Sequence, residues 1–110
     1  MNIKKITLIA FLILVTATVA FASAKEGYYH NTQRECIAIM DNGNGNYMVV
    51  WFDRAGRQDF RAANARLHGG NRILYQIGGS NHYIELRNNR NIIYCTRTRS
   101  EFTWSYGLGH

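Results

Sequence analysis

Glycine and asparagine interrupt this chain at short intervals, and the sequence contains no proline. Both residues tolerate the positive backbone φ that tight turns require, so their clusters mark turns. The segments between the turns are mostly 6 to 9 residues long, a length typical of β-strands and short for helices. The turn clusters are Asp41–Asn46, Asp53–Gly56, His68–Asn71, Gly78–Asn81 and Asn88–Asn89. The pattern therefore predicts a mainly β fold.

Hydrophobic patterning supports strands in the segments between these turns. Tyr47–Asp53 is apolar on both faces, as a central strand would be, and Asn81–Arg87 alternates with a period of two. The two faces of the second segment are His82, Ile84 and Leu86 on one side, and Tyr83, Glu85 and Arg87 on the other. Because 71–77 and 91–97 flank it at hairpin distance, we expect a three-stranded meander over 71–97.

Two segments are less clearly patterned. Gln58–Leu67 fits a strand, but an N-cap candidate at Asp59, three alanines and Gly69 just beyond also fit one short helix over 59–68. Both alternatives stay open at this point. The tail Thr96–His110 carries three aromatic residues on one parity and is interpreted as a last edge strand.

The first 24 residues have the layout of a secretory signal. Two lysines form a positive head, Ile6–Phe21 carries no charge, and Ala22-Ser23-Ala24 supplies the small residues that signal peptidase needs. A transmembrane anchor is the alternative, but the apolar run is short for a bilayer span. We therefore expect a signal peptide over 1–24 and a single secreted β domain over 25–110, with no membrane anchor after cleavage.

The two cysteines, Cys36 and Cys95, both lie in the exported part of the chain. Secretion places them in an oxidising compartment, so we expect one disulfide, which the chain-entropy model values at about 4 kcal/mol for this loop length. Such a bridge would close a small antiparallel β-barrel or sandwich by tying its ends together. The four histidines are scattered, so neither a metal site nor a cofactor is expected.

The positive net charge of the chain suggests an acidic partner but does not identify it. Removing residues 1–24 leaves 11 basic residues against 7 acidic ones, a net charge of +4, and ten of the basic residues are arginine. Guanidinium groups suit carboxylates, phosphates and aromatic faces. The outward residues Tyr83 and Arg87 form a candidate face for an anionic surface, and an ordinary solvated face is the alternative. No nucleic-acid partner is expected.

Enzyme motifs are scarce. The acidic residues lie on different predicted elements, so no catalytic residue is assigned. The arginines of 56–61, the run Arg72–Tyr75 and His82-Tyr83 loosely resemble the arginine and histidine region of barnase-like ribonucleases. The position of the glutamate base in that family corresponds here to Ala62, so a small secreted ribonuclease is only the third functional hypothesis.

A second resemblance covers 36–95. The order of Cys36, the pair Phe52-Asp53, a polar loop, Leu74-Tyr75, Gly79, an alternating strand and Cys95 is similar to the C-type lysozyme inhibitors of Gram-negative envelopes. This resemblance implies a periplasmic barrel that binds a lysozyme-like hydrolase. It makes an inhibitor of c-type lysozyme, or of a related envelope-directed protein such as a toxin, the most concrete functional hypothesis.

The family's inhibitory residues correspond to two places in this chain. The inhibitory loop corresponds to His68, Gly69, Gly70, Asn71 and Arg72, and it contains no serine here; the position of the family's lysine is Gly78. His68, Asn71 and Arg72 are candidate donors to a carboxylate, while a simple turn is the competing interpretation of the two glycines. The alternative function is a binding module for an anionic partner or an immunity-type protein.

Overall fold

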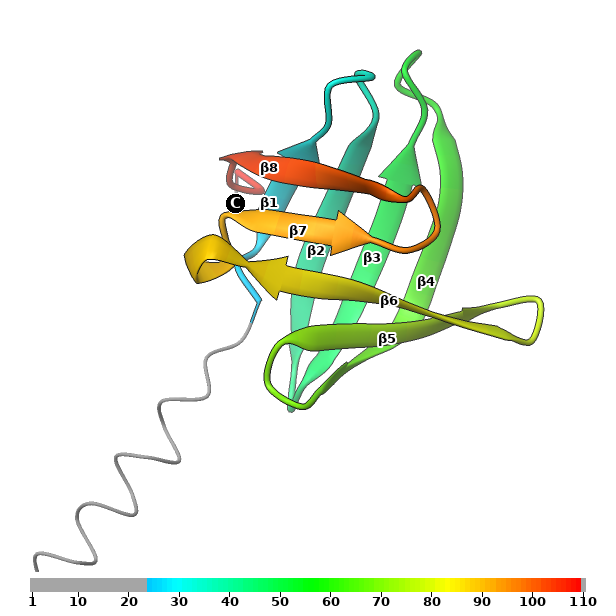
Figure 1. The fold of residues 1–110 in the computed structure, drawn as a ribbon, viewed down its shortest axis with the longest axis vertical. Coiled ribbons are helices and arrows are strands. Elements are labelled where there is room, and N and C mark those ends of the chain that lie inside the picture. The colour runs from blue at the N-terminus through cyan, green and yellow to red at the C-terminus, as the bar shows by residue number, and fades with distance from the viewer. Residues whose placement is uncertain (1–23, 110) are drawn as a thin grey trace, which may run out of the picture.

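The computed structural model describes residues 24–109, which form a closed antiparallel barrel of eight strands (Figure 1). Each strand pairs with the next along the chain, and the last pairs with the first. A 3₁₀ turn, η1 (Asn88–Arg90), links the sixth and seventh strands. The strands are β1 (Gly27–His30), β2 (Cys36–Gly43), β3 (Asn46–Phe52), β4 (Gln58–His68), β5 (Arg72–Ile77), β6 (Ser80–Arg87), β7 (Ile92–Cys95) and β8 (Ser100–Tyr106).

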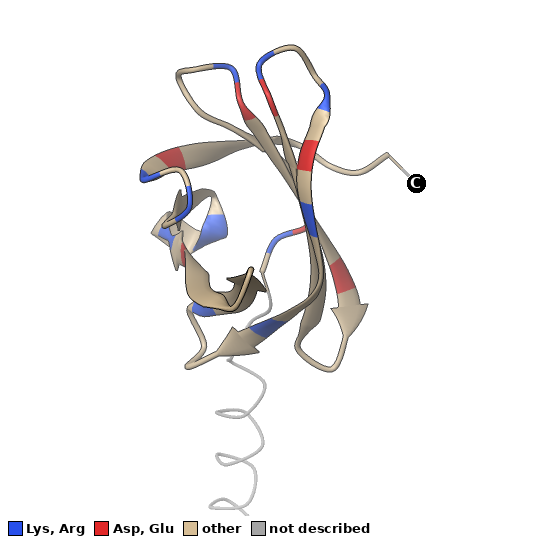
Figure 2. Cartoon of the chain, turned by 90° about the vertical axis from the view of Figure 1, so that its right-hand side faces the viewer, with Lys and Arg blue, Asp and Glu red and all other residues tan. Residues whose placement is uncertain are grey.

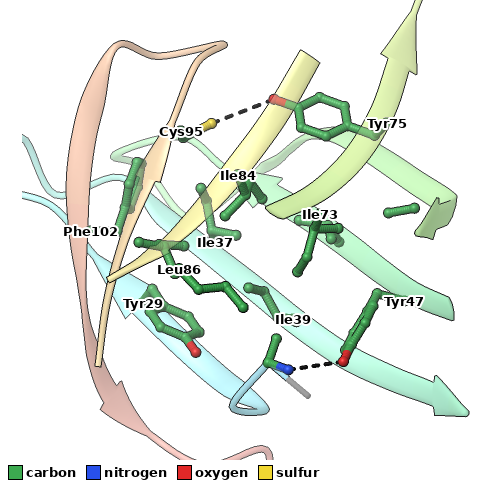
Figure 3. Packing of buried hydrophobic residues seen from close by; sticks show 14 of the residues in the cluster. Tyr29, Ile37, Ile39, Tyr47, Ile73, Tyr75, Ile84, Leu86, Cys95 and Phe102 are labelled. Atoms are coloured by element: carbon green, nitrogen blue, oxygen red, sulfur yellow. Dashed lines mark hydrogen bonds between the residues drawn. The ribbon is translucent and has the colours of Figure 1, made fainter. Parts of the chain in front are cut away.

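The barrel interior is filled by side chains that alternate inward along the strands (Figure 3). An eight-stranded barrel is just narrow enough for side chains to fill it. The fully enclosed residues are mostly aromatic or β-branched, which suits a pleated surface. They include Tyr29, Ile37, Ile39, Tyr47, Val49, Ile73, Ile84, Ile93 and Phe102.

The mainly β fold and the meander predicted over 71–97 are confirmed: β5, β6 and β7 pair in order. The helix alternative over 59–68 is wrong, because β4 is a continuous strand. Its inward positions hold small or apolar side chains, and pairing with β3 outweighs the helix-forming tendency of its three alanines. The tail strand β8 is not an edge, since it pairs with both β7 and β1.

The prediction of a disulfide is wrong, because both cysteines are free in the structure. Ile37 points into the core, so its neighbour Cys36 points to the outer face of β2, where it is half-buried. Cys95 belongs to the core on β7 and is fully enclosed. The two sulfurs therefore face opposite sides of the barrel wall, and burial raises the pKa of the Cys36 thiol. Closure comes from the β1–β8 ladder and not from a covalent bridge.

The β1–β8 closure rests on a close approach at Gly27. Its φ is +143°, and a Cβ placed there would lie 2.3 Å from Nε1 of Trp104. That indole donates a hydrogen bond to the carbonyl of Glu26 at 2.9 Å, and the ammonium of Lys25 lies 3.7 Å from the ring centroid. Only glycine fits this junction.

The predicted signal peptide lies outside the described residues, apart from Ala24. Ala24 packs in the core, and its backbone N–H donates to the Tyr47 hydroxyl at 2.9 Å (Figure 3). Between Ala24 and Gly109, no helix is long and apolar enough to span a bilayer.

Candidate functional site

Between β4 and the β5–β6 hairpin lies a cleft with a volume of about 640 Å³. This volume lies within the range of about 300 to 1,000 Å³ typical of ligand-binding clefts. In Figure 1 the β5–β6 hairpin runs across β4 at a steep angle. The lining residues are Arg61, Ala62, Ala63, Asn64, Arg66, Leu74, Tyr75, Gln76, Asn81 and His82.

The cleft exists because β4 and β5 separate. They pair only over Arg66↔Leu74, Leu67↔Ile73 and His68↔Arg72. Beyond these pairs, residues 58–65 of β4 pair with β3 alone, and 75–77 of β5 pair with β6 alone. The barrel wall therefore has a seam where two strand edges face each other without a shared ladder.

A bulge in β4 marks the start of the separation. Val49 pairs with Ala62 while Tyr47 pairs with Ala65, so β4 carries one residue more than β3 over this stretch. A bulge of this kind bends the strand and increases its local twist.

The same bulge places two arginines on one rim of the cleft. Arg61 and Arg66 are five residues apart, which in a regular strand would direct them to opposite faces. Their partners on β3, Val50 and Asn46, are four residues apart and share one face, so both arginines point outward. Within residues 24–109 neither guanidinium has an ion-pair partner, and both side chains are exposed.

The inner part of the cleft is aromatic. Tyr75 packs against Trp51 with ring centroids 4.9 Å apart, and His82 stacks on Tyr75 at 5.6 Å with an interplanar angle of 18°. Ala62 leaves space in front of these rings, because its side chain is a single methyl group. Burial and the neighbouring Cys95 raise the pKa of the Tyr75 hydroxyl, so this group stays neutral.

Beside the cleft, at the start of β4, Arg97 Nη2 contacts Asp59 Oδ2 at 2.7 Å. The guanidinium of Arg97 also lies over Trp51, 5.6 Å from the ring centroid, and over Phe60, at 5.4 Å. This contact joins the β7–β8 turn to β4 across the barrel end. The guanidinium of Arg97 is therefore engaged by Asp59 and the two aromatic rings, whereas the guanidinium groups of Arg61 and Arg66 are available to a ligand.

The predicted binding loop His68–Arg72 is a compact turn between β4 and β5. Gly69 and Gly70 have φ of +67° and +81°, as the turn interpretation requires. Arg72 lies over the ring of Tyr83 at 4.5 Å and 3.7 Å from Glu85. The turn lies at the closed end of the seam.

The predicted partner face of Tyr83 and Arg87 does lie on the outer surface of β6, but its charges are paired internally. Arg87 contacts Glu85 at 2.7 Å and Glu101 at 2.6 Å, and it lies over the ring of Tyr94 at 4.8 Å. Hydrogen bonds to these carboxylates, Glu85 foremost, raise the pKa of Arg87. An incoming anion would have to displace both carboxylates. Figure 2 shows basic and acidic positions interspersed over the barrel.

Four residues of the ribonuclease-like pattern meet in the cleft: Arg61, Leu74, Tyr75 and His82. The residues that line the cleft include no carboxylate. Within residues 24–109, moreover, His, Cys, Asp and Glu side chains form no group of three suited to a metal ion.

Sequence reasoning missed the cleft and its arginine pair. Arg61 belongs only to the ribonuclease-like pattern, and Arg66 lies two residues before the predicted loop. The available signal was Ala62-Ala63-Asn64-Ala65, a run of small side chains inside a strand of 11 residues, where a bulge is easily accommodated.

Comparisons with protein-family models, with curated proteins and with solved structures find no match for this chain.

Proposed function

We propose that this protein is a secreted binding protein that engages an anionic partner at the β4–β5 cleft. The observation that carries the proposal is the pair of exposed guanidinium groups, Arg61 and Arg66, on the rim of a cleft that contains no carboxylate. Secretion is supported by the sequence of residues 1–24. Arginine forks bind carboxylate and phosphate through paired charge-assisted hydrogen bonds.

The chemistry of the cleft favours binding over catalysis. General acid–base catalysis needs positioned groups that give and take protons, and His82 is the only imidazole or carboxylate that lines the cleft. Its ring stacks on Tyr75, which orients it as part of the cleft wall. His82, the phenol of Tyr75 and the side chain of Leu74 also line the cleft. They favour a partner whose anionic groups face the arginine rim and whose apolar groups face the inner wall of the cleft.

Binding titrations of the mature protein with poly-L-glutamate and with inorganic polyphosphate test this proposal. The Arg61→Ala/Arg66→Ala variant should weaken binding at least tenfold. The matched control is Arg34→Ala/Arg54→Ala, which removes the same charge from two exposed arginines outside the cleft. Equal losses of affinity in the two double variants would show that binding depends only on net charge, and would refute the proposed site.

The two probes also distinguish the anion. Preference for poly-L-glutamate assigns carboxylate recognition, and preference for polyphosphate assigns phosphate recognition. Binding of either probe that depends on the cleft arginines and weakens steeply with added salt supports the proposal. Absence of binding to both overturns it.

The lysozyme-inhibitor hypothesis names one concrete carboxylate-bearing partner, because a lysozyme cleft presents catalytic acids. The availability of Arg61 and Arg66 favours the β4–β5 cleft over the His68–Arg72 turn as the contact surface. Inhibition of c-type lysozyme lysis should then fall in Arg61→Ala/Arg66→Ala and persist in His68→Ala. The reverse pattern would assign inhibition to the turn, and no inhibition by the wild type would remove lysozyme as the partner.

A further inference from the structure

The seam between β4 and β5 exposes backbone as well as side chains. The ladder between the two strands stops at Arg66↔Leu74. Residues 58–65 of β4 therefore present an edge with no neighbouring strand on the cleft side. Unpaired strand edges are templates for the addition of another strand.

Two observations favour a foreign peptide over a second copy of this chain as the occupant. Arg61 and Arg66 lie on the β4 rim without ion-pair partners in the described part of the chain, so two such edges brought together would repel each other. The same charges attract an acidic segment. Leu74, at the narrow end of the seam, is 38% exposed and offers an apolar contact.

We propose that an extended acidic peptide adds to the β4 edge as a further strand within this cleft. The inference rests on the function proposed above and specifies its partner as a polypeptide. Successive side chains of the added strand would alternate between the outer rim, with Arg61 and Arg66, and the inner wall, with Ala62 and Tyr75. The matching sequence alternates acidic and small apolar residues.

The length of the added strand follows from the seam. The unpaired part of β5 facing β4 is 75–77, which spans about 10 Å at roughly 3.3 Å per residue. Three residues span this length, and the eight residues 58–65 of the free β4 edge leave room for a longer segment. A pentapeptide of alternating Glu and Val with blocked ends is therefore a suitable probe.

Backbone methylation of the probe separates strand addition from charge attraction. An added strand directs alternate N–H groups to β4, so the amides that pair form one set and the amides that point away form the other. Two peptides, each N-methylated on one set, have the same side chains and charge, and nearly the same methyl content. Because the changes are in the peptide, the fold of the protein is not perturbed.

We expect one methylated peptide to bind at least tenfold more weakly than the parent and the other to bind within about threefold of it. Hydrogen exchange should slow at amides within 60–65 when the parent peptide binds. Equal affinity of the two methylated peptides would overturn the proposal. If they bind equally and still require Arg61 and Arg66, anionic docking stands and strand addition fails.

Two further outcomes would also count against the proposal. If the protein self-associates without peptide and the same β4 amides become protected, the seam belongs to a second copy and the proposal is overturned. If the binding of poly-L-glutamate and the binding of polyphosphate are both indifferent to Arg61→Ala/Arg66→Ala, the proposed function itself fails, independently of the methylation result.

Discussion

Replacing Cys95 with alanine should destabilise the barrel much more than replacing Cys36 with alanine. Cys95 is fully enclosed, and its sulfur accepts a hydrogen bond from the indole N–H of Trp51 at 3.4 Å and lies 3.6 Å from the Tyr75 hydroxyl. Losing the buried sulfur costs about 1 kcal/mol, by analogy with small core deletions. Leaving the indole N–H unsatisfied costs about 1 kcal/mol more.

The total of roughly 2 kcal/mol corresponds to a fall in melting temperature of roughly 8 to 16 °C for a domain of this size. Cys36 is half-buried on the outer face, so Cys36→Ala should change the free energy of unfolding by only about 0.5 kcal/mol. The expected result is a pronounced asymmetry between two cysteine variants.

Urea unfolding of the wild type and both variants, each with and without dithiothreitol, measures this asymmetry. Thiol titration of the unfolded wild type without reductant should find two free thiols. A bridge shared by the two cysteines would instead produce equal losses of about 4 kcal/mol in both variants and a wild type sensitive to reductant. That outcome would refute the placement of the sulfurs on opposite faces of the wall.

Three further predictions concern one turn, the barrel closure and the buried N-terminal residue Ala24. Backbone N–H groups, that of Arg57 foremost, lower the pKa of Asp53, so Asp53→Asn should destabilise the protein at pH 7. This difference in stability should disappear as the pH falls through the folded-state pKa of Asp53. Equal losses of melting temperature at pH 7 and pH 2 would contradict the prediction. Gly27→Ala should lower the free energy of unfolding in urea by about 2 to 3 kcal/mol, because the added methyl group meets Trp104. An unchanged urea midpoint would argue against the tight β1–β8 junction. A chain that starts after Ala24 should be less stable by about 1 kcal/mol than one that retains it, and equal melting temperatures would show that its buried hydrogen bond is dispensable.

The meander and the strand segments could be predicted because local patterns specify them. In Asn81–Arg87 the alternation of apolar and polar residues matches the two faces of β6, with Ile84 and Leu86 in the core. The turn glycines were equally informative, since Gly69 and Gly70 have the positive φ expected of them.

Barrel closure could not be predicted in detail, because it depends on pairing between the two ends of the chain. β1 is only four residues long, and its pairing with β8 is decided by contacts such as Gly27 against Trp104. Similarly, cysteine counting gave the wrong result for Cys36 and Cys95. The number of cysteines does not reveal on which side of the wall each side chain lies.

The candidate site was missed because a bulge changes strand parity. Regular alternation separates Arg61 from Arg66, and only the extra residue opposite Tyr47–Val49 places them together. Conversely, the outward position of Arg87 was predicted correctly, but its pairing with Glu101 depends on β8, which lies two strands away around the barrel.

A ¹⁵N–¹H amide map of the protein during titration with poly-L-glutamate tests the location of the site most directly. The account predicts that the largest shifts fall on 60–66 of β4 and 74–77 of β5, and that they are lost in Arg61→Ala/Arg66→Ala. Shifts concentrated instead on the His68–Arg72 turn or on the outer face of β6, with the cleft amides unchanged, would contradict it.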